Sequence, residues 1–174
     1  MDDSGEVYTS MDFLAAVGAV ALNWAVIEGA LDFAIATIFH ELRNDKMEPE
    51  IPRGLEKKIA FLRQSLRHPK LAPIRAQSRA LLTALKNTKD ERHSLVHGPV
   101  MAVADHGDTV LTLQIRYTKT RHRLSSVEVT TEQVEARAHT AHALSDRATR
   151  FSVAVFNIAH PEKPIDYPLG EFAG

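Results

Sequence analysis

The sequence predicts a mainly α fold, in which four helices form a bundle and a small antiparallel β insertion separates the third helix from the fourth. Apolar residues recur every three or four positions in four stretches, which predicts helices over about 11–43, 53–68, 73–97 and 131–159. Over about 100–129 the apolar period changes to two, which predicts strands. The 174 residues, 44% of them hydrophobic, suit one domain over 1–160 with a real core. We expect the Pro-rich tail over 161–174 to lie extended on the surface or to be disordered.

The first two helices are defined by their apolar spacing and by the linker between them. Apolar residues step by three or four from Phe13 to Leu42, which predicts a long first helix. The linker over 48–52 contains two prolines, and each residue before a proline avoids the α region. The second helix turns Leu55, Ile59 and Leu62 inward and has a basic edge.

The third and fourth helices have sequence signals at their ends. Pro73 suits the first turn of the third helix, and Gly98-Pro99 forbids its continuation. Three alternating runs follow, and a basic segment over 118–123 forms the predicted tip between the last two strands. Thr130 and Gln133 have the spacing of a capping box, which predicts the start of the fourth helix.

Composition limits the location and the chemistry of the protein. The absence of cysteine excludes disulfides, thiolate metal sites and a cysteine nucleophile, and it fits a reducing compartment. The N-terminus is acidic, and the first apolar stretch carries polar residues such as Asn23, Glu28 and Asp32. This pattern predicts a cytoplasmic protein with neither a signal peptide nor a membrane span.

The formal net charge of −1 hides an uneven distribution along the chain. Residues 1–50 hold 2 Lys or Arg and 10 Asp or Glu, whereas residues 51–125 hold 15 and 5. A basic middle third is what a polyanion-binding face needs, because phosphate contacts supply most non-specific affinity. The alternative is that the basic segment neutralises the acidic first helix packed against it.

A fixed cation and a titratable imidazole lie close together at the end of the third helix. Arg92 falls in the buried register of Leu81, Leu85 and Leu95, and an inward guanidinium needs an acidic partner, a ligand or a water-filled groove. His97 follows five residues later. A simpler interpretation is that both residues favour the helix macrodipole and cap free carbonyls.

The heptapeptide from Arg92 to Gly98 resembles the signature of the HEPN superfamily. In that signature an Arg is followed four to six residues later by a His, usually with Asn, Asp or His directly after the Arg and often with Gly after the His. The resemblance extends to the first helix with Trp24 and Glu28 and to Lys57-Lys58-Ile59, so it covers roughly the first hundred residues. Asn is the commonest residue after the Arg in that family, and this chain has His93 there.

The resemblance implies a HEPN-like bundle and a metal-independent endoribonuclease that needs no cofactor and whose motif residues meet at a homodimer interface. His97 would take or give a proton at the 2′-hydroxyl or the leaving oxygen, and Arg92 would stabilise charge developing on the phosphate. His93 would orient the site or hold RNA, and Ser94 would donate a hydrogen bond. Apart from the resemblance, Glu28 adjoins the apolar stripe of the first helix, which makes it a candidate buried partner of Arg92; the alternative is a flanking residue whose carboxylate reaches solvent. Helix positions five apart diverge by about 140°, so Arg92 and His97 converge only if the helix ends between them or if two chains contribute.

Further cations would hold the RNA backbone without reading its sequence. These predicted contacts are Lys57, Lys58, Arg121 and Arg123. The alternatives are a solvated helix face for the lysines and a charged edge that discourages aggregation for the arginines. The resemblance is compatible with a toxin–antitoxin or phage-defence setting, with RNA and a cognate antitoxin protein as partners and with no membrane partner.

Two other classes of protein stay open. The chain could use the fold as a non-catalytic dimeric binding or interaction module, with Arg92 and Glu28 as a structural pair. A metal-dependent site is the third class. It would use His93 and His97, one helical turn apart, or one register of the fourth helix, which contains Glu135, His139, His142 and Asp146. A solvated face explains that register more simply.

Overall fold

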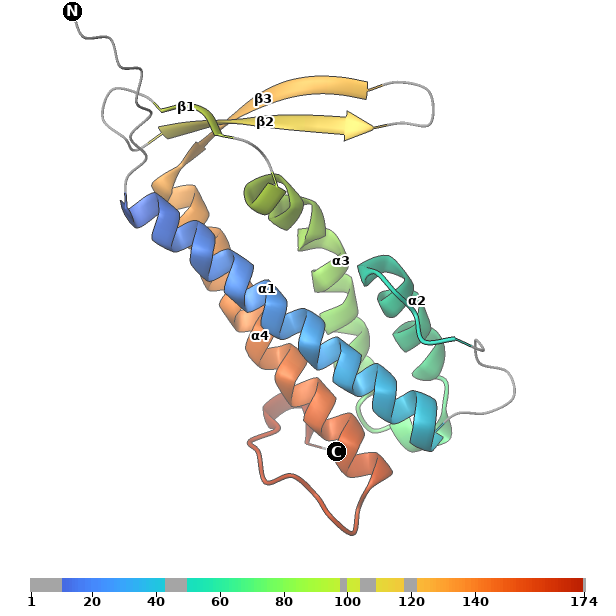
Figure 1. Ribbon diagram of the computed structural model, residues 1–174. Helices are drawn as coiled ribbons and strands as arrows, with labels where there is room; N and C mark the ends of the chain where they lie inside the picture. The colour runs from blue at the N-terminus through green and yellow to red at the C-terminus, as the bar shows by residue number, and fades with distance from the viewer. Residues whose placement is uncertain (1–10, 43–49, 98–99, 104–108, 118–121, 174) are drawn as a thin grey trace, which may run out of the picture. The chain divides into compact units, whose positions relative to one another are not determined.

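The computed structural model describes residues 11–42, 50–97, 100–103, 109–117 and 122–173, with the side chains of all but 91–94, 96–97, 100–103, 109–117 and 122–127. The described elements, in chain order, are α1 (Met11–Thr37) with a π turn η1 (Ile38–Leu42), α2 (Leu55–Ser65), a 3-10 turn η2 (Pro69–Leu71), α3 (Arg75–His97), β1 (Val100–Val103), β2 (Thr109–Tyr117), β3 (His122–Thr130), α4 (Thr131–Ala159) and η3 (Gly170–Phe172) (Figure 1). The predicted mainly α fold is confirmed. The second helix is shorter than predicted, because Gly54 precedes its first turn and His68 caps η2.

The chain divides into two compact units. The first contains Met1–Asn23 and Lys89–His142, and the second contains Trp24–Thr88 and Ala143–Gly174. The sequence predicted a single domain over 1–160. The division passes through α1, α3 and α4 rather than through a linker, so neither composition nor turn signals mark it.

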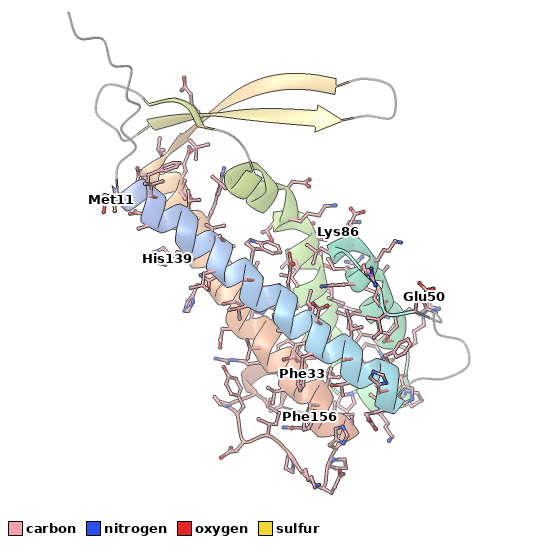
Figure 2. The ribbon with its side chains drawn as sticks, viewed as in Figure 1. Met11, Phe33, Glu50, Lys86, His139 and Phe156 are labelled. Atoms are coloured by element: carbon pink, nitrogen blue, oxygen red, sulfur yellow. The ribbon has the colours of Figure 1, made fainter. Side chains whose placement is uncertain are left out.

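The second unit packs segments of all four helices around an apolar core. Phe33 of α1 stacks on Phe156 of α4, with ring centroids 5.6 Å apart, and Figure 2 labels both rings. Lys58 Nζ of α2 lies 2.6 Å from the Asp32 carboxylate of α1. Most of the predicted inward positions are buried, whereas Leu55 is half-buried, and this burial accounts for the helical spacing of the apolar residues. The core includes Trp24, Ile27, Leu31, Ile35, Ile59, Leu62, Leu66, Leu81, Leu85, Phe151 and Val155.

The Pro-rich tail folds back onto α4 within this unit. The Asn157 side chain accepts a hydrogen bond from the Ile165 amide at 2.8 Å and donates one to the Ile165 carbonyl at 3.0 Å. Arg147 forms a bidentate pair with Glu171, and the Phe172 ring is buried against Phe151 with centroids 6.0 Å apart. Residues 161–169 are largely exposed, as predicted, whereas the docked end was not predicted.

The first unit contains a three-stranded antiparallel sheet in the order β1-β2-β3. Strands β2 and β3 pair in unbroken register from Thr109 with Thr130 to Tyr117 with His122, and β1 pairs with β2 through an irregularity after Val100. The predicted capping box joins β3 to α4. The Thr130 amide donates to Gln133 Oε1 and the Gln133 amide donates to Thr130 Oγ1, both at 3.2 Å.

One helical span among the described residues, Met11–Leu42, has the length and the apolar composition that crossing a membrane requires. The core helix of a soluble protein and a signal sequence pass the same test, and this span lies near the N-terminus. Buried residues such as Ile27 and Leu31 form one face of this span and belong to the core of the second unit.

Candidate functional site

The Arg92 motif lies in the last two turns of α3, where the sequence predicted it. α3 ends at His97, so Arg92, His93, Ser94 and His97 all have helical backbone. The side chains of these four residues, and Gly98-Pro99, lie outside the described part of the structure. Leu95, in the middle of the motif, is buried, as the predicted inward register requires.

The continuity of α3 bears on the two predicted ways of bringing Arg92 and His97 together. The helix does not end between them. On a regular helix these positions point about 140° apart around the axis. The remaining way, in which two chains contribute, stays a prediction.

The predicted carboxylate partner, Glu28, is a half-buried residue of α1 beside the buried Ile27. Glu28 belongs to the second unit and Arg92 to the first. The pairing of these two residues stays a prediction.

The predicted RNA-contacting lysines differ in their surroundings. Lys58 is mostly buried, with 11% of its side chain exposed, and its ammonium is held by Asp32. Lys57 is exposed on the same helix. Arg123 lies in β3, whose side chains are not described at that position, and Arg121 is outside the described residues. Two of the four predicted contacts, Lys57 and Lys58, have described side chains. Of these two, Lys57 is the exposed one.

The histidines of α4 do not gather into a metal site within the described part of the chain. His139 is exposed, and His142 Nδ1 lies 3.4 Å from Asn23 Oδ1 in the first unit. Asp146 of the second unit pairs with Arg150 at 2.7 Å. No group of three potential ligands among the described His, Asp and Glu residues could hold a metal ion.

The basic edge of the second helix was noted from the sequence, but its grouping with exposed cations of α3 was not. Arg63 Nη2 donates to Thr83 Oγ1 at 3.1 Å, and Arg79 and Lys86 flank Thr83 on the exposed side of α3. A signal was present, because residues 57–88 contain eight Lys or Arg and no Asp or Glu. We name Arg63, Arg79, Thr83 and Lys86 the α2–α3 cluster.

No family model matches the chain, and no curated protein or solved structure is significantly similar to it.

Proposed function

We propose that this protein is a metal-independent endoribonuclease of the HEPN type, with an active site shared by two protomers. The observation that carries the proposal is the unbroken α3, which places an Arg and a His five positions apart at one helix end. Because those positions point about 140° apart, one protomer would supply Arg92 and its partner would supply His97. Homodimerisation is thus part of the proposed mechanism.

The proposed reaction is attack of an RNA 2′-hydroxyl on the adjacent phosphorus. The 2′-oxygen forms a bond to phosphorus while the bond to the 5′-oxygen breaks, which leaves a 2′,3′-cyclic phosphate and a 5′-hydroxyl. His97 takes the 2′-hydroxyl proton or returns a proton to the 5′-oxygen, because an ordinary imidazole pKa near 6.5 suits both tasks at neutral pH. Arg92 stabilises the charge that develops on the phosphate oxygens, since its planar fork matches their geometry. His93 and Ser94 orient the RNA.

The decisive experiment is cleavage of labelled single-stranded RNA in excess EDTA. Purified protein should cut RNA, leave a cyclic phosphate end and spare DNA of the same sequence, which lacks the attacking 2′-hydroxyl. His97→Ala should lower the rate by about 10²- to 10⁴-fold, the usual contribution of a positioned acid or base. His139→Ala is the matched control, because His139 is exposed on α4 and outside the motif. Intact RNA after hours with wild-type protein, or equal loss in both variants, would contradict the proposal.

A second candidate function, a non-catalytic interaction module, is favoured by the exposed side of α1. Met11, Leu14 and Leu22 in the first unit expose between 49% and 78% of their surface. In the second unit Val26 and Phe33 are exposed on the same helix. Exposed apolar side chains in such number are typical of a protein-binding face.

The two candidates predict different results in one series of measurements. The module should dimerise or bind a partner and leave RNA whole, and His97→Ala should change neither property. The ribonuclease should lose cleavage in His97→Ala without losing the dimer.

A further inference from the structure

The segment from Lys57 to Thr88 has an unusual charge composition. It contains eight Lys or Arg, while all 22 Asp and Glu residues of the protein lie in the other 142 positions. The segment forms α2 from Lys57 onward, η2 and the first part of α3, all within the second unit. In Figure 1, α2 and α3 run antiparallel and are joined through η2.

Two of the eight cations are not fully exposed and have partners inside the unit. Lys58 pairs with Asp32, and Arg75 Nε donates to the Leu66 carbonyl at 2.6 Å. The other six are exposed, and no described carboxylate forms an ion pair with them. They are Lys57, Arg63, Arg67, Lys70, Arg79 and Lys86.

The α2–α3 cluster brings three of these charges onto one surface. The Thr83 hydroxyl donates to the Arg79 carbonyl at 2.9 Å and accepts from Arg63 Nη2, so the Arg63 guanidinium of α2 is held against α3. Arg79 precedes Thr83 by four residues and Lys86 follows it by three, which places both on the same side of α3. Figure 2 labels Lys86 on this helix. Because Arg63 is held by a neutral hydroxyl, its charge and most of its five N–H donors remain available.

Three like charges without a carboxylate repel one another, so an anion that binds among them would relieve that repulsion. Arg79 and Lys86 are about 10 Å apart along the helix axis, at 1.5 Å per residue. That span exceeds a single phosphate group and suits a chain of phosphates. The cluster therefore favours a polyanion over one small ion.

The surface also differs from one that binds lipid bilayers. Peripheral membrane helices combine basic residues with large exposed apolar side chains that enter the headgroup region. The exposed large apolar residues of the described chain lie at positions 11–33, 51, 165 and 167, and none falls within 57–88. The observations favour a nucleic acid over an anionic membrane.

We infer that the α2–α3 cluster binds the sugar-phosphate backbone of single-stranded RNA, as a surface of the second unit separate from the Arg92 motif. The identity of the polyanion as RNA rests on the proposed function. The binding surface itself rests on the charges and the hydrogen bonds described above. Contacts of this kind position RNA and do not select its sequence, because the phosphates are the same along every strand.

The test measures RNA binding under conditions in which the probe is not cleaved. Fluorescence anisotropy with labelled oligo-uridine, in EDTA and in the full-length His97→Ala background, reports affinity without loss of the probe. Arg79→Gln/Lys86→Gln is compared with Arg137→Gln/Lys163→Gln, which removes the same charge outside the α2–α3 cluster. Thr83→Val removes the anchor of Arg63 without changing the charge.

The cluster double variant should bind about tenfold more weakly near physiological salt, while the control pair should stay within about twofold of the parent protein. The slope of log K against log salt should flatten by about 1.4, because each neutralised phosphate of a single strand contributes about 0.7. Thr83→Val should show an intermediate loss at an unchanged melting temperature. Equal losses in the two double variants would overturn the inference, because affinity would then follow net charge alone. Binding of phosphatidylserine vesicles that needs the cluster while oligo-uridine binding does not would overturn it as well.

Failure of the inference and failure of the proposed function give different results. Cluster-dependent RNA binding with no cleavage by the wild-type protein keeps the binding surface and removes the ribonuclease. Cleavage that disappears in His97→Ala, together with RNA affinity that is unchanged in the cluster variant, keeps the ribonuclease and removes the binding surface.

Discussion

Asn157 holds both backbone polar groups of Ile165, with its Oδ1 2.8 Å from the Ile165 amide nitrogen and its Nδ2 3.0 Å from the Ile165 carbonyl oxygen. One side chain on α4 thus fixes the direction of the tail eight residues later. Asn is suited to this role because its amide contains one donor group and one acceptor.

Asn157→Ala should lower the free energy of unfolding by about 1–2 kcal/mol, since two partly exposed hydrogen bonds are lost and each contributes about 0.5–1.5 kcal/mol. Urea denaturation followed by circular dichroism measures the change. Asn87→Ala, at an exposed position of α3, is the control and should stay within about 0.5 kcal/mol of the wild type. Equal stability of Asn157→Ala and wild type would contradict the tail geometry.

The buried end of the tail gives a second prediction. Phe172→Ala should destabilise the protein by about 3 kcal/mol or more, because a buried ring against Phe151 is replaced by a cavity or by an undocked tail. Tyr167→Ala changes an exposed ring of the same tail and should have little effect. The same denaturation experiment compares them, and similar losses in both variants would show that burial of Phe172 is not what holds the tail.

Replacement of Gly170 and of Gly29 by alanine should change the stability of the protein in opposite directions. Gly170 has a φ of 55°, and a Cβ there would collide with the Arg150 guanidinium, so Gly170→Ala should cost about 1–3 kcal/mol. Gly29 lies in α1 with nothing within 4 Å of the position of an added Cβ. Gly29→Ala should therefore stabilise the protein by about 0.5–1 kcal/mol through helix propensity. Thermal unfolding of the two variants side by side checks both signs.

At the start of α4, the hydroxyls of two adjacent residues should have opposite effects on the stability of the protein. Thr130→Ala should destabilise the protein by about 1 kcal/mol, because the capping box loses its side-chain acceptor. Thr131 Oγ1 is buried, with no hydrogen-bond partner among the described residues. Thr131→Val keeps the shape and removes the unsatisfied group, so it should be neutral or stabilising by up to about 1 kcal/mol. A destabilising Thr131→Val in urea titrations would mean that the hydroxyl has a partner.

Mixing two inactive variants tests whether two chains share the proposed active site. In a symmetric dimer, Arg92→Gln and His97→Ala are each inactive, but a mixed dimer regains one site with an intact Arg and an intact His. With random exchange, half of the dimers are mixed and each has one of two sites, so about a quarter of wild-type activity should return. Activity in each variant alone is the control. No recovery after exchange, verified by native mass spectrometry, would place both residues of a site in one chain.

The sequence predicted the long elements well, because their signals are periodic and local. The apolar spacing located the buried faces of α1, α3 and α4, and Thr130 with Gln133 located the first residue of α4. The position of the motif at the end of α3 was predicted in the same way, from the Gly98-Pro99 stop.

What the sequence did not predict depends on contacts between distant residues. Nothing in the local pattern marks Asp32 as the partner of Lys58, 26 positions later, or Thr83 as the anchor of Arg63. The tail was expected from its prolines to lie extended on the surface or to be disordered, whereas Phe172 near its end is buried.

The docked tail makes the segment around Phe172 a reporter of the folded state. Phe172 is 1% exposed. Chymotrypsin, which cleaves after aromatic residues, should spare this position in the native protein, because proteolysis needs an extended and accessible chain, and it should cut there once α4 and the tail separate. Cleavage measured by mass spectrometry would then follow local opening at this one place, without a spectroscopic probe and without any change to the sequence.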